Sequence, residues 1–171
     1  MISKRKKKIV FLTGTRADYG KLKPLITATK KNKKFHLIIV ITGMHLKKKY
    51  GSTYTQIEKD FSNTDIYKIY NYNKNDSMDI VLAKTIKYFG QTIKKINPDL
   101  VVIHGDRVET LAATIHCNLN NVLTCHIEGG EVSGTVDESI RHATTKLSHI
   151  HFVSNLKAKN ILKRMGEVDK N

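Results

Sequence analysis

The sequence predicts an α/β fold with a doubly wound parallel sheet. Short runs of β-branched and apolar residues alternate with amphipathic helical segments along the chain, and a polar motif follows nearly every run. Continuous Val- and Ile-rich runs flanked by helices are typical of parallel strands that are buried on both faces. The 171 residues suffice for one domain, and no internal linker, repeat or low-complexity segment divides them.

Each expected strand is a short apolar run. The runs are Ile9–Thr13, Leu37–Thr42, Ile66–Tyr70, Leu100–His104, Val122–Ile127 and Ile150–Val153. Helices are expected at about 19–31, 52–60, 78–96, 107–119, 138–148 and 155–165. Segment 78–96 is the clearest helix, because its apolar residues recur at three- and four-residue steps and Asn97-Pro98 then stops it.

Lysine dominates the formal net charge of +15. Its runs at 4–8, 30–34 and 47–49 fall where helices or strands start and stop, without the interleaved aromatic residues of a single-strand nucleic-acid binder. We therefore interpret the lysines as a solvated surface and do not expect a nucleic-acid partner. Binding to an acidic macromolecule is the alternative.

The sequence shows no signal for a membrane or for disulfides. No apolar run approaches the ~20 residues of a membrane-spanning helix, and the run IVFL is too short for a signal peptide. We expect a cytoplasmic protein without a membrane partner. Cys117 and Cys125 match no metal or disulfide pattern, so we expect buried free thiols.

Arginine is scarce and is placed differently from lysine. Three of the five arginines, Arg16, Arg107 and Arg141, lie in polar motifs. A guanidinium group can grip phosphate or carboxylate through two parallel hydrogen bonds, which an ammonium group cannot do. The arginines therefore predict an anionic ligand or carboxylate partners at these motifs.

The polar motifs are expected to converge in space. They are GTR (14–16), GMH (43–45), GDR (105–107) and EGG (128–130), and each follows an expected strand. The carboxyl ends of parallel strands lie on one edge of the sheet, where such folds bind ligands. Residues that are far apart in the sequence should therefore form one site.

Two glycine-containing motifs point to different chemistry. GTRADYGKL (14–22) turns from a strand into a helix, whose free N–H groups and Arg16 suit an anion. A plain turn with Asp18 as the N-cap is the structural alternative. GGEVSG (129–134) resembles the start of a P-loop, but the lysine and hydroxyl residues that should follow are missing. A kinase or ATPase is therefore excluded.

Two strand ends each place a histidine two residues before an acid. His104 precedes Asp106, and His126 precedes Glu128. These four side chains could ligate a divalent metal, act as acid, base or substrate contacts, or be structural. The sequence leaves these three interpretations open.

A third acid follows in VDESIRH (136–142). Asp137 could cap the helix or pair with Arg141 one turn on. Capping does not explain why acids from three separate segments should meet at one sheet edge. Like charges close together raise the pKa of a carboxyl group, which is how such a group becomes a proton donor near neutral pH.

Four strings extend over most of the chain in order. They are TGTRADYGKL (13–22), GMHLKKKYGSTY (43–54), HGDRVETLAA (104–113) and HIEGGEVSGTVDESIRHATTKLSHIHF (126–152). These strings resemble the UDP-N-acetylglucosamine 2-epimerase family, in the hydrolysing branch that makes N-acetylmannosamine for sialic-acid-type sugars. GTRADYG favours this branch, because the non-hydrolysing branch tends to read GTRPE.

The resemblance implies a GT-B arrangement of two Rossmann-like domains around the active site, and a reaction without metal or redox cofactor. A base removes the C2 proton of the sugar while UDP leaves C1, and water then adds to the 2-acetamidoglucal with the opposite C2 configuration. By the same resemblance, Asp106, Glu128 and Asp137 supply acid–base chemistry and cation stabilisation. The expected substrate-binding residues are Arg16, His45, Arg107 and Arg141.

Family members are much longer than this chain, which corresponds to their N-terminal half. We therefore expect residues 1–171 to form a single Rossmann-like domain that lacks the C-terminal UDP-binding domain, and the missing half argues against independent activity. A truncated or split epimerase, completed by a C-terminal half, is the first hypothesis. An inactive domain that binds a nucleotide sugar or forms a homo-oligomer is the second, and a metal hydrolase is a weaker one.

Overall fold

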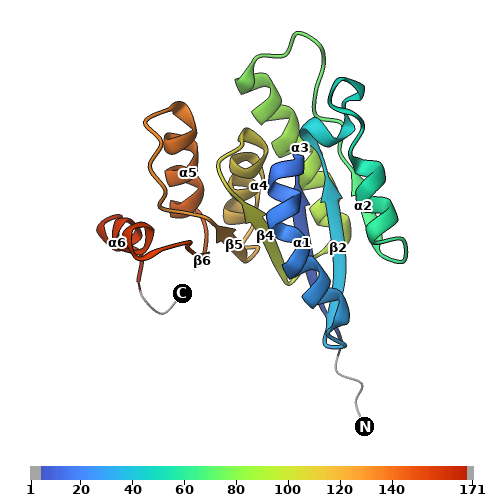
Figure 1. The fold of residues 1–171 in the computed structure, drawn as a ribbon, viewed down its shortest axis with the longest axis horizontal. Coiled ribbons are helices and arrows are strands. Elements are labelled where there is room, and N and C mark those ends of the chain that lie inside the picture. The colour runs from blue at the N-terminus through green and yellow to red at the C-terminus, as the bar shows by residue number, and fades with distance from the viewer. Residues whose placement is uncertain (1–4, 169–171) are drawn as a thin grey trace.

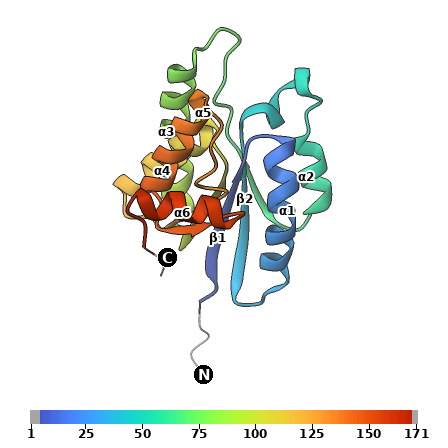
Figure 2. The same cartoon turned by 60° about the vertical axis from the view of Figure 1, so that its left-hand side comes forward.

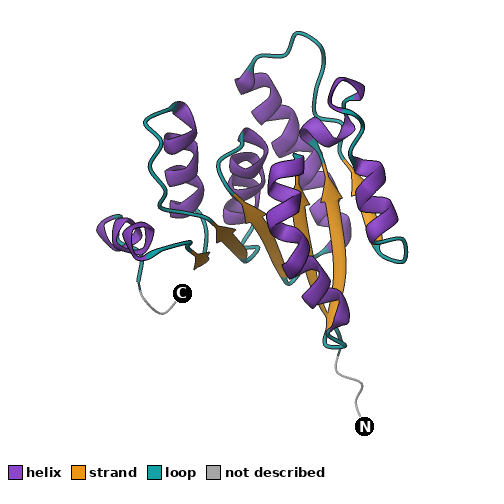
Figure 3. Ribbon diagram, viewed as in Figure 1, coloured by secondary structure: helices purple, strands orange, loops and turns teal. Residues whose placement is uncertain are grey.

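The computed structural model describes residues 5–168 and contains one six-stranded sheet in the order β3-β2-β1-β4-β5-β6 (Figure 3). Every neighbouring pair is parallel. The strands are β1 (Lys7–Thr13), β2 (Phe35–Ile41), β3 (Asp65–Lys68), β4 (Leu100–His104), β5 (Thr124–Ile127) and β6 (Ile150–Phe152). The order reverses between β1 and β4, so the predicted doubly wound topology is confirmed.

Helices cover both faces of the sheet (Figure 1). They are α1 (Arg16–Lys31), α2 (Tyr54–Asp60), α3 (Met78–Ile96), α4 (Val108–Leu119), α5 (Val136–Lys146) and α6 (Leu156–Arg164), and two short 3₁₀ turns, η1 (Gly43–Leu46) and η2 (Lys48–Tyr50), follow β2. Figure 2 shows α1 and α2 on one side of the sheet and α3, α4 and α5 on the other. Among residues 5–168, no helix has the length and apolar character needed to cross a bilayer.

The strands are apolar on both faces because each face packs against helices. In β1, Ile9 and Phe11 join a buried cluster with Leu22 of α1, whereas Val10 joins a second cluster with Phe89 of α3. Successive strand side chains point to opposite faces, so a strand between two helical layers must be apolar at nearly every position. This double burial explains the continuous apolar runs of the central strands, whereas the edge strands β3 and β6 are only partly buried.

Cys117 and Cys125 are free and buried, as expected. Burial raises the pKa of each thiol to about 12, so both remain protonated at neutral pH. They behave as small apolar core residues.

The start of α1 differs from the sequence expectation. Thr15 is the N-cap, and its side chain accepts a hydrogen bond from the Asp18 backbone N–H at 3.2 Å. Asp18 lies at the third helical position and accepts the Thr15 backbone N–H at 3.0 Å in return. The structural alternative with Asp18 as the N-cap is therefore not formed, because Thr15 and Asp18 form a reciprocal capping box.

The loop from β5 to α5 packs against α6. Glu131 Oε1 accepts hydrogen bonds from Ser154 Oγ and from Asn155 Nδ2, the latter at 2.9 Å. Gly130 has a φ of +81°, and a Cβ there would lie 2.5 Å from the Ala158 carbonyl oxygen. Only glycine fits both the backbone conformation and the contact with α6.

We expect Gly130→Ala to lower the free energy of unfolding by about 3 kcal/mol, because left-handed strain adds to a steric clash. Gly134→Ala is the matched control, since Gly134 has a φ of +68° in the same loop but open space around it. Its cost should be about 1 kcal/mol from strain alone. Urea unfolding of the two variants measures the difference, and equal losses would contradict the packing described for Gly130.

Candidate active site

A cavity of about 310 Å³ opens at the carboxyl edge of the sheet. It is lined by residues that follow β1, β4 and β5, together with residues of α1 and α5. Its charged or titratable lining includes Lys21, His104, Asp106, Arg107, Glu128 and Arg141. Three of the polar motifs identified in the sequence therefore meet in one cavity.

One side of the cavity is built around Arg141, which is only 8% exposed. Its Nη2 donates a hydrogen bond to Asp106 Oδ2, and its Nη1 donates to the Glu131 carbonyl oxygen at 2.6 Å. A buried guanidinium group requires such partners to compensate for its lost hydration. Arg141 thus connects α5 to the loops after β4 and β5.

The expected pair between Asp137 and Arg141 is not formed. Arg141 pairs with Asp106 instead, and Asp137 is exposed in the first turn of α5. The preference follows from burial, because an ion pair along an exposed helix face contributes little, whereas a buried guanidinium group needs a carboxylate close by.

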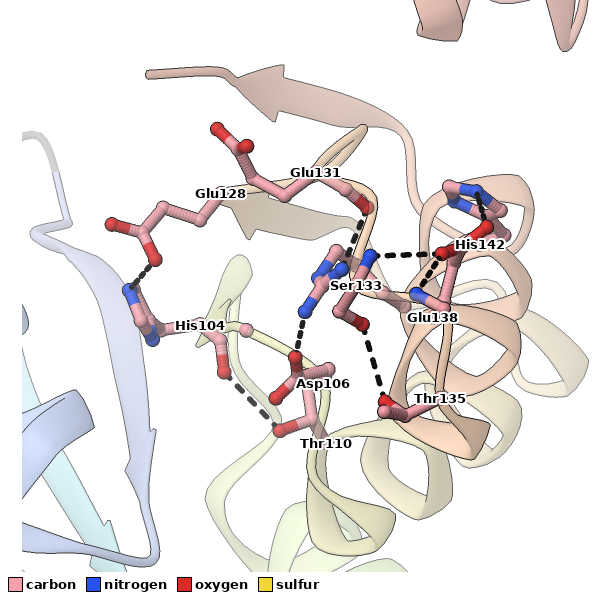
Figure 4. Close-up of polar contacts among 12 residues, drawn as sticks. His104, Asp106, Thr110, Glu128, Glu131, Ser133, Thr135, Glu138 and His142 are labelled. Atoms are coloured by element: carbon pink, nitrogen blue, oxygen red, sulfur yellow. Dashed lines mark hydrogen bonds and ion pairs between the residues drawn. The ribbon is translucent and has the colours of Figure 1, made fainter. Parts of the chain in front are cut away.

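Glu128 forms the other side of the cavity. Lys21 Nζ lies 2.6 and 2.7 Å from the two carboxylate oxygens of Glu128, and His104 Nε2 lies 3.1 Å from Oε2 (Figure 4). Glu128 also has a φ of +63°, an uncommon conformation for a residue with a side chain. Such strain is often concentrated at functional sites.

The neighbours of Glu128 determine its ionisation. Burial raises the pKa of Glu128, but the Lys21 hydrogen bond and the nearby charges of His104 and Lys21 outweigh it, so the net shift is downward. Burial lowers the pKa of His104, and the charge of Glu128 opposes that shift only in part. At neutral pH, Glu128 is therefore ionised and His104 is mainly neutral.

This result corrects the expectation that clustered acids would raise a carboxyl pKa here. Asp106 and Glu128 line the same cavity, but each has its own cation, Arg141 and Lys21 respectively. Because its pKa is lowered, Glu128 stays ionised and is suited to stabilise positive charge; the same shift makes it a weaker base and leaves it no proton to donate at neutral pH.

His45 does not line this cavity. It is fully buried, and its Nε2 lies 3.0 Å from Thr13 Oγ1 while its Nδ1 lies 2.7 Å from Thr53 Oγ1. Thr13 in turn donates a hydrogen bond to Asp18, a lining residue. His45 therefore stabilises the turn between β1 and α1 through Thr13, although it does not line the cavity.

Arg16 and Asp137 also lie outside the cavity lining. Both are exposed, at the beginnings of α1 and α5 respectively. Within residues 5–168, neither side chain forms a hydrogen bond or an ion pair. Of the seven predicted site residues, Asp106, Arg107, Glu128 and Arg141 are brought together, and Arg16, His45 and Asp137 are not.

The alternative of a metal site is not supported by the placement of its four side chains. His126 is buried, with Nε2 2.8 Å from the Gly105 carbonyl oxygen and Nδ1 3.1 Å from Thr145 Oγ1. Burial lowers the pKa of His126 to about 4, so it is a neutral structural residue. In the described part of the chain, no three His, Cys, Asp or Glu side chains gather as metal ligands.

Sequence reasoning missed Lys21. The residue lies inside the motif GTRADYGKL, but lysine is so common in this chain that its identity carried no signal. The position of Lys21 was informative, because Lys21 follows Asp18 by three residues and the two therefore share the face of α1 that lines the cavity.

Residues 27–171 match the family model described as UDP-N-acetylglucosamine 2-epimerase. The chain belongs to this family. A Neisseria meningitidis serogroup B protein named UDP-N-acetylglucosamine 2-epimerase is 46% identical over 162 residues, which cover 94% of this chain and 42% of that protein. A Legionella pneumophila protein named UDP-N,N'-diacetylbacillosamine 2-epimerase (hydrolyzing) is 41% identical over 94% of this chain and 43% of that protein.

A solved structure supports the fold. The crystal structure of UDP-GlcNAc 2-epimerase from Neisseria meningitidis bound to UDP-GlcNAc matches with a TM-score of 0.83 at 24% identity, over 94% of this chain and 43% of that one. The expected fold, one half of a GT-B-type arrangement, is confirmed. The epimerase-family chain spans less than half the length of the curated relatives it matches.

We expect Lys21→Ala to raise the pKa of Glu128, because the change removes the ammonium group that stabilises the carboxylate. Lys23→Ala is the matched control, since Lys23 lies on the same helix but pairs with Asp60 at 2.6 Å. Carboxyl ¹³C NMR during an acid titration measures the Glu128 pKa in both variants. An unchanged Glu128 pKa in Lys21→Ala would contradict the ion pair.

Proposed function

We propose that this chain is the N-terminal domain, over residues 1–171, of a hydrolysing UDP-N-acetylglucosamine 2-epimerase. The enzyme would convert UDP-N-acetylglucosamine and water into UDP and N-acetylmannosamine. One observation carries this proposal. Asp106 and Glu128 line the same cavity, and each carboxylate is paired with a cation, Arg141 and Lys21 respectively. Family membership supplies the substrate class.

The proposed reaction begins with an elimination. One carboxylate accepts the C2 proton while the C1–O bond breaks, and the bonding electrons leave with UDP. Hydration of the resulting 2-acetamidoglucal then adds a proton to C2 from the opposite face and a hydroxyl group to C1. The ionised state of Glu128 suits it to accept a proton or to stabilise cationic character at C1. The proposed route uses no metal and no cofactor.

The remaining residues receive roles that match their positions. Arg141 orients Asp106, and Arg107 faces the cavity as a cation for the diphosphate. Arg16 is exposed beside the N-terminus of α1, a position that favours an anion. His45 supports the turn through Thr13. The assignment of Asp137 to the acid–base set rests on the family resemblance.

The hydrolysing subtype is supported by the GTRADYG motif and by the printed name of the Legionella relative. On this basis we assign the product to sialic-acid-type sugar synthesis in the cytoplasm. A further modified UDP sugar, as in the name of that relative, is a second substrate candidate.

A second candidate function is nucleotide-sugar binding without turnover. It is favoured by the placement of Arg16 and Asp137 outside the cavity and by the coverage of less than half of each relative. A complementary C-terminal half or a homo-oligomer would then be the partner that completes the site.

Proton NMR of the chain, mixed with a separately expressed C-terminal half and UDP-N-acetylglucosamine in heavy water, tests the proposed reaction. We expect UDP and N-acetylmannosamine that carries deuterium at C2. Accumulation of UDP-N-acetylmannosamine would contradict the hydrolysing subtype. Saturable binding of the sugar nucleotide without any product would favour the second candidate.

In the same assay, Asp106→Asn should lower turnover by roughly 10²–10⁴, the usual contribution of a positioned acid or base. The asparagine oxygen can still accept the hydrogen bond from Arg141, but the buried guanidinium group loses its counter-charge, so circular dichroism must first show that the variant folds. Asp76→Asn is the control, because Asp76 pairs with Lys84 at 2.7 Å and lies outside the cavity lining. Equal activity of the two variants would remove Asp106 from the proposed mechanism.

A further inference from the structure

A buried carboxylate beside the cavity has no role in the chemistry described above. Glu109, in the first turn of α4, is only 3% exposed. Its Oε2 is enclosed and has no hydrogen-bond partner within residues 5–168. An ionised carboxylate removed from water is destabilised unless positive charge compensates for it. Glu109 therefore requires a cationic neighbour.

That neighbour is Arg107. Its Nε lies 3.6 Å from Glu109 Oε2, and in the described part of the chain this Nε also lacks a hydrogen-bond partner. The Arg107 side chain as a whole is 41% exposed and lines the cavity. The Nε of Arg107 is thus enclosed beside Glu109, while other parts of the Arg107 side chain line the cavity.

Packing on the other side keeps Glu109 in place. Gly43 follows β2 with a φ of +59°, and a Cβ at this position would lie 2.7 Å from Glu109 Oε1 and 3.1 Å from the Gly14 carbonyl oxygen. Glu109 therefore contacts the turn after β2 closely, and it cannot move away from Arg107 in that direction. The glycine at position 43 provides the space that the carboxylate occupies.

We propose that Glu109 is a positioning residue that holds Arg107 toward the cavity, where the guanidinium group meets the diphosphate of the substrate. The other two cations of the cavity, Lys21 and Arg141, are paired with Glu128 and Asp106, which line the cavity themselves. Glu109 is not among the lining residues, so it can hold Arg107 without occupying the cavity. A side chain that is already oriented loses less entropy when it binds a ligand. The identity of the ligand rests on the proposed function, whereas the contact between Glu109 and Arg107 does not.

The first test needs no ligand. The chain has five arginines, so their Nε–H signals can be resolved by NMR of the ¹⁵N-labelled protein, and Arg107→Lys assigns the signal of interest. We expect Glu109→Gln to accelerate hydrogen exchange at the Arg107 Nε by about tenfold, the effect of one lost charged contact, and to leave Arg141 unchanged. Unchanged exchange at Arg107 would overturn the proposal.

A second variant reaches Arg107 indirectly. Gly43→Ala should displace Glu109 and accelerate exchange at the Arg107 Nε in the same direction. Gly51→Ala is the matched control, because Gly51 has a φ of +81° but no atom within 4 Å of an added Cβ. If the two glycine variants have the same effect on Arg107, Glu109 does not transmit the change and the proposal fails.

A double-mutant cycle tests the functional consequence. Calorimetry with UDP should show about fivefold weaker binding for Glu109→Gln, and no further loss when the change is made in Arg107→Ala. Asp79→Asn, which removes a first-turn acid of α3, controls for the loss of a helix-terminal charge. If Glu109→Gln weakens UDP binding equally in the unmodified chain and in Arg107→Ala, Glu109 acts through packing and the proposal fails. Absence of UDP binding even after a separately expressed C-terminal half is added would count against the proposed function, while the exchange experiment still decides the role of Glu109.

Discussion

The site depends on one buried cation. Arg141 binds the Asp106 carboxylate and the Glu131 carbonyl oxygen, so it joins the loop after β4 to the loop after β5. These loops carry the acids that line the cavity, and acids close together repel one another unless a cation lies between their segments. Lys21 does the same for Glu128 from α1, which couples the first strand of the sheet to the fifth. The sheet topology brings the loops to one edge, and these ion pairs determine how the loops meet.

Charge compensation has a consequence for ligand binding. Lys21 is paired with Glu128, Arg141 with Asp106, and Arg107 lies beside Glu109. The cations of the cavity are therefore neutralised before any ligand enters. An incoming diphosphate would have to share these cations with their carboxylates, as proposed for Arg107, or use the exposed Arg16, which has no such partner within residues 5–168.

The fold was predictable from the sequence because burial on both faces makes each central strand a continuous apolar run, as in Ile38–Ile41 of β2. The location of the site at the carboxyl edge of the sheet followed from the same topology.

The ion pairs of the cavity were not predictable from the sequence. Lys21 and Glu128 are separated by 107 positions, and no periodicity relates them. The local rule that paired Asp137 with Arg141 failed because a tertiary partner was available in Asp106. The lowering of the Glu128 pKa depends on these pairings, so the general rule that clustered acids raise a carboxyl pKa did not indicate it.

The contact between the β5–α5 loop and α6 has a dynamic consequence. Gly130 lies against the Ala158 carbonyl group, and Glu131 accepts hydrogen bonds from Ser154 and Asn155 at the start of α6. Glu128 is only two residues before Gly130. Local opening of α6 would therefore release the loop that carries this carboxylate, and the two segments should open as one cooperative unit. The lifetime of the cavity geometry is then limited by the stability of a helix that contributes no side chain to the cavity lining.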